Sequence, residues 1–389
     1  MFGKSEPLVV ASDVHLTRGG SERSAGRLAK LIEQHAGHEI VLAGDIFNLS
    51  LDAPSRDPAE SIASIVAEYP TLTTSLRRHL DAGHAVTLIS GNHDAGVMTR
   101  GTRDRLLQAI GAAAEARLVI EPWFIRRGDV HVEHGHVYDP DNAPAHPLAA
   151  WSPETEPLGI ALTRRFLSPH DAFHFAHAHH TTPLQGLTDA VKTFRGRAPM
   201  MIFHYFATSS RLAAEAAVPE RMGAEKARGE AALDDFATHS GVPSEVVRAL
   251  YRALPRPTHE DFKRTFFRLY FDRVVATLGV AGGATRMLLG GLGGGVVGGA
   301  VALSGALYLH QSVRKGVDRY SSLPVKRLFE GAELVREITG AKLVIFGHTH
   351  CEDEAEGYKN SASFSYTYRQ GSPYLFVDPS GRAERREIQ

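Results

Sequence analysis

The sequence contains almost no cysteine, no excess of either charge and no recognisable secretory leader. Cys351 is the only cysteine in 389 residues, which excludes an internal disulfide and fits a reducing compartment. The 43 basic and 44 acidic side chains leave a formal net charge of -1, and this balance disfavours a nucleic-acid partner, which usually requires a basic excess. Because the first residues contain too short an apolar run for a signal peptide, we expect a cytoplasmic protein.

Charge is also scarce within one long segment. Between Val274 and Leu309 the only charged side chain is Arg286, and residues 287–309 include eight glycines. At a helical rise, this run is long enough to cross the hydrocarbon core of a bilayer.

Elsewhere, apolar β-branched runs alternate with amphipathic stretches, which is typical of α/β proteins. The amphipathic stretches include residues 23–35 and 60–80. The runs that predict strands are Leu8 to Ala11, Glu39 to Ala43, Ala85 to Ile89, Val130 to Glu133, Lys342 to Phe346 and Tyr374 to Val377.

The alternation breaks off in the middle of the chain. Between about 140 and 330 the sequence becomes rich in proline and histidine, then alanine-rich and helical, and then glycine-rich. We therefore predict one α/β core built from residues 1–140 and 331–389. A large, mostly helical insertion over 141–330, which includes the apolar segment 274–309, interrupts this core.

Polar motifs follow five of the predicted strands. They are SDVH (Ser12 to His15), GD (Gly44 and Asp45), GNHD (Gly91 to Asp94), EHGH (Glu133 to His136) and GHTH (Gly347 to His350). Taken singly, each motif is equally explained as a helix cap, a turn or a surface histidine. Five of them at five strand ends are better explained by one shared site, because ligands gather at the carboxyl ends of strands in open α/β sheets.

The residue types in these motifs indicate a metal site. Carboxylate oxygens combined with imidazole nitrogens suit Mn, Fe or Zn better than Ca or Mg, which prefer oxygen ligands alone. With seven candidate ligands and no cysteine among them, two ions that share one bridging carboxylate are the economical arrangement. We expect two divalent ions, with Mn as the first choice and Fe or Zn as alternatives.

In this order, the motifs resemble those of the calcineurin-like binuclear metallophosphoesterases, over roughly the first 140 and the last 50 residues. The resemblance implies a four-layer αββα sandwich. It also implies that Asp13, His15 and His350 hold the first ion, that Asn92, His134 and His348 hold the second, and that Asp45 bridges the two. In that pattern His93 is catalytic and lies over the substrate, and Asp94 orients it.

The chemistry expected of such a site is metal-dependent hydrolysis of a phosphoester or a diphosphate. Two neighbouring ions lower the pKa of a bound water, so the expected nucleophile is a metal-bound hydroxide. His93 could donate a proton to the leaving oxygen or stabilise the transition state as a cation.

The sequence indicates the class of reaction more clearly than the substrate. Serine/threonine phosphatases of this family usually carry GDxVDRG and GNHE, whereas this chain has GDIFNLS and GNHD. The chain is distantly similar to the UDP-2,3-diacylglucosamine hydrolases, which also insert a helical lid before the last motif, although those enzymes usually have arginine in place of His93 and a shorter lid. We therefore expect a lipid-linked or membrane-surface substrate. A soluble nucleotide phosphodiesterase or phosphatase is the alternative, and a non-catalytic scaffold is disfavoured by the complete ligand set.

The motif order also restricts the apolar segment. Four motifs precede it and GHTH follows it, so a single membrane span would separate ligands that must meet. A helical hairpin that enters and returns, with Arg286 or the adjacent glycines near its turn, satisfies this restriction. A glycine-rich helix pair buried within the protein or at an oligomer interface is the alternative, and we expect contact with the cytoplasmic face of a membrane.

Three neighbouring features are expected to lie outside the ligand set. We expect Cys351 to pack against the core, and we expect His136 either to orient His134 or to be structural. The histidine cluster 170–180 matches no closed metal site, and a wall or lid over the active site is the preferred interpretation.

Overall fold

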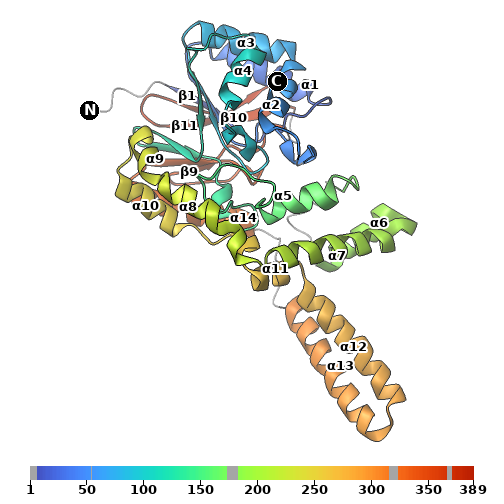
Figure 1. The fold of residues 1–389 in the computed structure, drawn as a ribbon. Helices are drawn as coiled ribbons and strands as arrows, with labels where there is room; N and C mark the ends of the chain where they lie inside the picture. The colour runs from blue at the N-terminus through green and yellow to red at the C-terminus, as the bar shows by residue number, and fades with distance from the viewer. Residues whose placement is uncertain (1–6, 54, 173–182, 315–322, 366–369) are drawn as a thin grey trace. The chain divides into compact units, whose positions relative to one another are not determined.

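The computed structural model describes residues 7–53, 55–172, 183–314, 323–365 and 370–389. They belong to two compact units (Figure 1). Unit 1 comprises Met1–Ser168, Glu220–Pro257 and Pro324–Gln389, and unit 2 comprises Pro169–Pro219 and Thr258–Leu323. The domain boundaries proposed from the sequence stay a prediction, and the two units are described separately.

The first sheet of unit 1 has six strands, and its central strands are parallel. In sheet order the strands are β11 (Ala383–Ile388), β10 (Ser372–Val377), β1 (Leu8–Ala11), β2 (Glu39–Ala43), β3 (Val86–Ile89) and β4 (Leu118–Glu121). Strands β1 to β4 are parallel neighbours, and β10 joins β1 antiparallel. The carboxyl ends of β1, β2 and β3 therefore lie at one edge of this sheet.

Four helices cover the outer face of this sheet. They are α1 (Glu22–Gln34), α2 (Pro58–Ala67), α3 (Pro70–Asp81) and α4 (Thr102–Ile110). Their apolar side chains share one buried cluster with Val9 and Ala11 of β1. The sequence predicted one amphipathic stretch over residues 60–80, but the structure has two helices there. Proline is tolerated in the first turn of a helix but not in its interior, so a new helix begins at Pro70.

The second sheet of unit 1 has five strands. In sheet order they are β5 (Phe124–Arg127), β6 (Val130–Glu133), β7 (Leu343–Phe346), β9 (Tyr358–Asn360) and β8 (Glu354–Ala355). Strands β6 and β7 are parallel, although more than 200 positions separate them in the sequence. Helices α9 (Leu233–Ser240), α10 (Ser244–Ala253) and α14 (Leu323–Thr339) contribute to the core on the outer face of this sheet.

A third apolar cluster joins the two sheets. It contains Leu8 and Val10 of β1 together with Val130 and Val132 of β6, so alternate residues of each strand point into the space between the sheets. The resulting order of layers is helix, sheet, sheet, helix. The expected α/β sandwich with additional helical sequence is confirmed, and the six strands predicted from apolar runs are all present.

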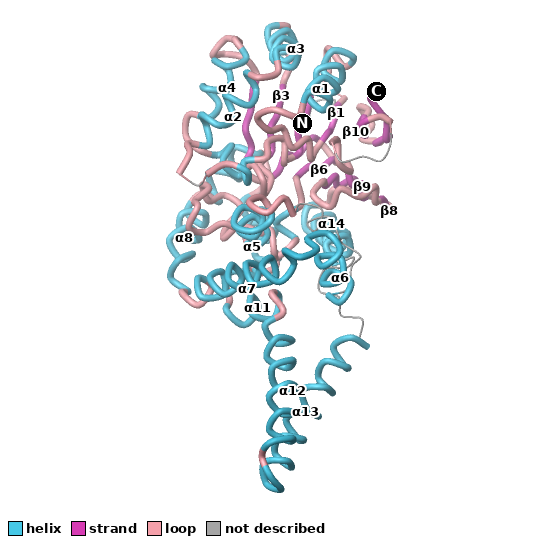
Figure 2. Tube along the Cα trace, turned by 90° about the vertical axis from the view of Figure 1, so that its right-hand side faces the viewer, coloured by secondary structure: helices cyan, strands magenta, loops and turns pink. Residues whose placement is uncertain are grey.

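Unit 2 is helical in its described part. It contains α6 (Pro183–Phe194), α7 (Ala198–Glu215), α11 (Phe262–Arg268), α12 (Phe271–Leu289) and α13 (Gly291–Arg314). Figures 1 and 2 both show α12 and α13 side by side, and the turn between them falls at Gly290. The helical hairpin expected from the apolar segment is therefore present, with Arg286 in the last turn of α12.

Candidate metal centre

The structure brings together the polar motifs that follow β1, β2, β3, β6 and β7. Asp13 lies two residues beyond the end of β1, Asp45 two beyond β2 and His134 one beyond β6. Their side chains are 0%, 1% and 1% exposed, respectively. Three residues from different strands, in two different sheets, therefore point into one buried site.

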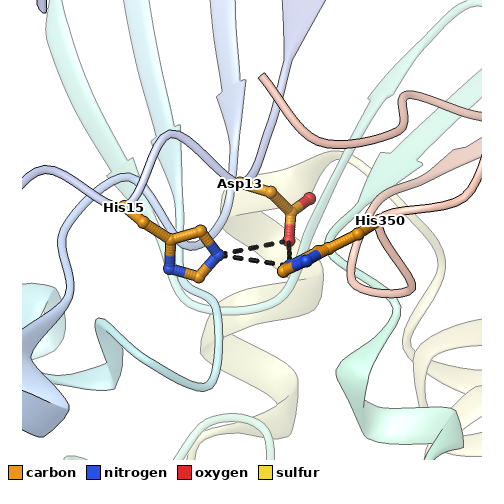
Figure 3. Close-up of side chains that lie close together, drawn as sticks. All are labelled: Asp13, His15 and His350. Atoms are coloured by element: carbon orange, nitrogen blue, oxygen red, sulfur yellow. Dashed lines mark hydrogen bonds and ion pairs between the residues drawn. The ribbon is translucent and has the colours of Figure 1, made fainter. Parts of the chain in front are cut away.

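The first group consists of Asp13, His15 and His350, as Figure 3 shows. His350 Nε2 lies 3.0 Å from Asp13 Oδ1 and 3.2 Å from His15 Nε2. His15 Nε2 lies 3.8 Å from the same carboxylate oxygen. Two imidazole nitrogens and one carboxylate oxygen that converge in this way can surround a single cation.

The second group contains Asp13, Asp45 and His134, with Asn92 beside it. His134 Nε2 lies 3.3 Å from Asp45 Oδ2 and 3.1 Å from Asn92 Oδ1. The other ring nitrogen of His134, Nδ1, is 2.9 Å from the carbonyl oxygen of Ala43, a contact that fixes the orientation of the ring. Asp45 Oδ2 is also 4.0 Å from His15 Nε2, so this carboxylate lies between the two groups.

His348 lies beside the second group, and its ring centroid is 5.3 Å from that of His134. Its Nε2 faces Asp139, with 3.2 Å to Oδ2. Asp139 also accepts a hydrogen bond from Asn142 Nδ2 at 2.8 Å, and Asn142 Oδ1 is 3.4 Å from Asn92 Nδ2. Asp139 and Asn142 thus connect two candidate ligands, and neither was predicted from the sequence. The available signal was their position, five and eight residues after His134.

The backbone at this site is strained. Nine non-glycine residues in the described ranges have a positive φ, and five of them are candidate ligands. These five are Asp13 at 56°, His15 at 49°, Asp45 at 55°, His348 at 68° and His350 at 57°. Left-handed backbone costs an L-residue about 1–2 kcal/mol and persists only where the surroundings enforce it, so its concentration here indicates a functional site.

Glycines in the motifs provide the space that this packing needs. A Cβ atom on Gly44 would lie 2.4 Å from His134 Cγ, and one on Gly91 would lie 2.2 Å from Asp45 Oδ1. A Cβ on Gly347 would lie 2.4 Å from Ser12 Oγ. Any side chain at these positions would displace a candidate ligand or its neighbour.

The electrostatics of the site favour a cation. Burial raises the pKa of Asp13, but His350 and His134 outweigh that effect and hold this pKa at about 2. Burial lowers the pKa of His134, but Asp45 and Asp13 outweigh that effect and raise it to about 10. The buried carboxylates therefore stabilise positive charge at the His134 ring, and the same field would stabilise a divalent metal ion. The donor set and its charge fit the metal ions expected from the sequence.

His93 lies next to the first group, with its ring centroid 5.0 Å from that of His15. Its backbone N–H donates to Asp45 Oδ1 at 2.8 Å. Its Nδ1 lies 3.1 Å from Ser50 Oγ and 3.2 Å from Asn48 Oδ1. Asn48 and Ser50 were not predicted as partners of His93, although they lie three and five residues after Asp45 in the GDIFNLS segment.

Asp94 was predicted to orient His93, and the structure gives its carboxylate different partners. That carboxylate accepts hydrogen bonds from the backbone N–H groups of Gly91 at 2.7 Å and Ile46 at 2.7 Å, with a longer one from Asp45. Asp94 therefore ties the loop after β3 to the loop after β2. The neighbours that orient the His93 ring are Asn48 and Ser50, which corrects the prediction.

Two other predicted neighbours are also placed. His136 is buried, and its ring centroid lies 5.3 Å from that of His134 and 6.5 Å from that of His348. Cys351 is half-buried, and burial raises the pKa of its thiol. In the histidine cluster 170–180, His170 Nε2 contacts His204 Nδ1 at 3.2 Å, and residues 173–180 lie outside the described ranges.

A small pocket in unit 1 adjoins Asn92 and His93. Its apolar wall includes Leu49, Trp151 and Ile160. Arg56 and Arg164 also line the pocket. Arg164 is held by Glu156, with Nη2 2.8 Å from Oε1, whereas Arg56 is exposed. The pocket offers apolar surface beside the candidate catalytic residue, and its charged lining consists of Arg56, Arg164 and Asp52.

The two packed sheets and the carboxylate–imidazole cluster at their strand ends define a metal-dependent phosphoesterase. Residues 6–206 match the family model described as calcineurin-like phosphoesterase. Because this match covers more than half of the chain, the protein belongs to that family and is a hydrolase of phosphoesters. The match includes the motifs from SDVH to EHGH, and GHTH lies beyond its end. No curated protein matches the chain.

Proposed function

We propose that the protein uses two divalent metal ions to hydrolyse a phosphoester or diphosphate bond in a lipid-linked or membrane-surface substrate. The observation that carries the hydrolytic part is the convergence of Asp13, Asp45 and His134 with their neighbours in one buried site. The proposed substrate class comes from the helical insertion before the last motif, which by sequence resembles the lid of the UDP-2,3-diacylglucosamine hydrolases.

The residues divide into two sets around Asp45. Asp13, His15 and His350 would hold one ion, and their three donor atoms lie within 4.8 Å of one another. Asn92, His134 and His348 would hold the second ion. The position of Asp45 Oδ2 between His15 and His134 supports a bridging role for this carboxylate. We expect Mn in both positions, with Fe or Zn as alternatives.

When bound, such an ion pair lowers the pKa of a coordinated water and withdraws charge from the phosphoryl oxygens. His93 would donate a proton to the leaving oxygen. Its Nδ1–H can donate to Asn48 Oδ1, which leaves Nε2 to carry a proton toward the substrate. Burial lowers the pKa of His93, Asp45 opposes the shift and nearby histidines reinforce it. An anionic substrate beside the ring would favour the protonated form.

The lipid-linked part of the proposal is supported by the pocket and by the apolar hairpin. Trp151 and Ile160 provide surface for an organic group next to the reacting phosphoryl group, and Arg56 provides positive charge for its anionic part. The hairpin of unit 2 supplies an exposed apolar surface of the kind that a membrane-associated enzyme needs. We place the enzyme on the cytoplasmic face of a membrane.

The test is a hydrolysis panel with metal-loaded protein. The substrates are a nucleotide-linked lipid, a lipid diphosphate, soluble nucleotides, p-nitrophenyl phosphate, bis(p-nitrophenyl) phosphate and single-stranded DNA. We expect the highest kcat/KM on a lipid-linked substrate, with activity lost on chelation and restored by Mn²⁺. Preference for soluble nucleotides would replace the lipid assignment, and no hydrolysis in any metal would leave a binding scaffold as the conclusion.

Three variants connect the activity to the site, and two of them form a matched pair. Asp45→Asn should reduce hydrolysis to background, whereas Asp104→Asn should leave it unchanged, because the Asp104 side chain is 82% exposed and lies in a surface ion pair. His93→Gln should lower kcat by about 10²–10⁴-fold with both metals retained, as expected for loss of a general acid. Full activity in an Asp45→Asn protein of verified metal content would refute the metal assignment.

A further inference from the structure

The hairpin formed by α12 and α13 is apolar on its outside. The described ranges contain 19 exposed large hydrophobic side chains, and 12 of them lie on these two helices. Leu292 is 95% exposed, Leu289 81%, Leu288 78% and Val296 75%. A soluble protein rarely exposes a continuous apolar surface of this kind, so another phase or another molecule must cover it.

The two helices of the hairpin pack closely against each other where glycine residues face the opposite helix. A Cβ on Gly283 would lie 2.6 Å from Ala302 N, and one on Gly298 would lie 2.5 Å from Gly283 O. A Cβ on Gly305 would lie 2.8 Å from Ala276 O. The two backbones therefore touch along one seam, as small residues permit in membrane helix pairs, and the larger side chains are directed away from the seam.

Three hydroxyl groups of the hairpin donate hydrogen bonds within their own helix. Thr277 Oγ1 donates to Arg273 O, Thr285 Oγ1 to Ala281 O and Ser304 Oγ to Ala300 O, each at 2.8–2.9 Å. Because every one of these bonds reaches back four residues in the same helix, these side chains need no water. This is the condition that a hydrocarbon environment imposes on polar groups.

We propose that α12 and α13 insert as a pair into the hydrocarbon core of a lipid bilayer and return to the side from which they enter. An interfacial helix needs one polar face, but from Val274 to Leu309 the only charged residue is Arg286. The stretch Gly291–Ser312 has a mean hydropathy of 1.6, and only 6% of its apolar window is buried. A helix that is apolar on all sides and unburied by its own chain fits hydrocarbon.

The length of the hairpin and the residues at its base fit insertion across a hydrocarbon core. The 19 residues from Gly291 to Leu309 span about 28 Å at a helical rise, close to the roughly 30 Å thickness of a hydrocarbon core. Tyr270, Arg273 and Tyr308 lie at the base, where Arg273 stacks over the Tyr270 ring at 4.7 Å and the Tyr308 hydroxyl donates to Asp272. Tyrosine and arginine are typical of the membrane interface.

Arg286 is placed one turn before the end of α12, near the tip of the hairpin. At the depth of a hydrocarbon core, the tip approaches the opposite interface, so the long arginine side chain can extend to the far headgroups. A second copy of the chain explains the exposed apolar surface less well than lipid does. The glycines already form the contact between α12 and α13, and the exposed apolar side chains lie on both helices.

Binding is tested with the full-length protein and vesicles of phosphatidylcholine, with and without 30% phosphatidylglycerol. We expect the protein to float with both kinds of vesicle, more strongly with the anionic ones because of the basic residues Lys263, Arg264 and Arg268 near the base, and to resist extraction by alkaline carbonate. Protein that stays soluble beside vesicles would overturn the proposal. Complete release by carbonate, or a discrete oligomer that excludes lipid, would do the same.

A matched pair of variants locates the binding on the hairpin. Val296→Asp places a charge deep in the inserted part and should weaken vesicle partition about a hundredfold. Ala113→Asp places the same charge on an exposed loop of unit 1 and should not change it. Both variants should still hydrolyse soluble bis(p-nitrophenyl) phosphate, which verifies the fold. Equal vesicle binding by the two variants would refute the proposal.

The membrane inference rests on the proposed function only for the identity of the substrate. Vesicle binding is measured without turnover, so a protein that inserts but leaves lipid-linked substrates intact would contradict the substrate assignment alone. A protein that cleaves such substrates in detergent but ignores vesicles would contradict the hairpin proposal alone.

Discussion

Replacing Gly44 with alanine should displace His134 and weaken metal binding. Gly44 has a φ of +84°, a conformation that costs alanine about 1–2 kcal/mol. The new Cβ would lie 2.4–2.6 Å from three atoms of His134. Such overpacking lowers the free energy of unfolding by a further 1–3 kcal/mol, roughly. We therefore expect Gly44→Ala to lower the free energy of unfolding by about 2–5 kcal/mol.

The structure provides a matched control at Gly20. Its φ is +83°, almost the same as that of Gly44, but a Cβ there would have no neighbour within 4 Å. Gly20→Ala should therefore lower the free energy of unfolding only by the backbone cost of about 1–2 kcal/mol, and it should keep the wild-type metal affinity. The difference between the two variants isolates the contact with His134.

Urea unfolding of the metal-free proteins measures the stability of both variants, and calorimetric titration with Mn²⁺ measures their metal affinity. Because His134 contacts both Asp45 and Asn92, its displacement should weaken binding of at least one ion by about 10–100-fold. If Gly44→Ala loses no more stability than Gly20→Ala and binds Mn²⁺ as the wild type does, then the close packing of His134 does not organise the metal site.

Three further predictions concern individual side chains. Asn48→Asp places a carboxylate beside His93 Nδ1 and should raise the pKa of His93, moving the alkaline limb of the kcat/KM profile upward by about one pH unit; an unmoved limb would separate Asn48 from catalysis. Asp139→Asn should weaken binding of one metal ion by about 10–100-fold, measured by metal titration, because His348 loses its carboxylate partner; unchanged affinity for both ions would contradict this role. Burial, reinforced by Lys226, lowers the pKa of His146 from 6.5 to about 4, so the folded protein should lose about 1–2 kcal/mol of stability as the pH falls from 6.5 toward 4. His146→Gln should flatten this part of a urea-denaturation pH series, and a slope equal to that of the wild type would exclude His146 as its source.

The strands and the candidate ligands were accessible from the sequence because both depend on local patterns. Apolar runs of four or five residues predict β1, β2 and β6, and a carboxylate or histidine directly after such a run lies at the end of its strand. Parallel pairing then brings these ends together without any knowledge of the loops. Asp45 follows β2, which pairs with β1, so the sequence already predicts that its carboxylate lies close to the ligands that follow β1.

The positions of loop side chains were not accessible in this way. Asn48 reaches His93 across 45 positions, and Asp139 reaches His348 across 209, so these contacts depend on loop paths that no periodicity encodes. The assignment of Asp94 failed for a related reason. The GNHD motif places it next to His93, but its side chain turns toward backbone N–H groups of the preceding loop.

The packing of helices was equally difficult to predict. Helix α10 has a clear apolar face with Val247 and Leu250 buried, and in the sequence it belongs to the long segment between EHGH and GHTH. An apolar face shows that a helix is covered and does not show by which sheet. In the structure that face joins the cluster of Phe346 and Tyr358 in the second sheet.

The late position of β7 in the chain has a consequence for biosynthesis. This strand pairs with β6 on one side and β9 on the other, and it is followed by His348 and His350. A growing chain therefore completes α12 and α13 before it can assemble the metal site, because synthesis proceeds from the N-terminus. If the hairpin inserts as proposed, the nascent protein would reach a membrane while it is still unable to cleave a phosphoester, because the metal site is completed only after the hairpin has been made.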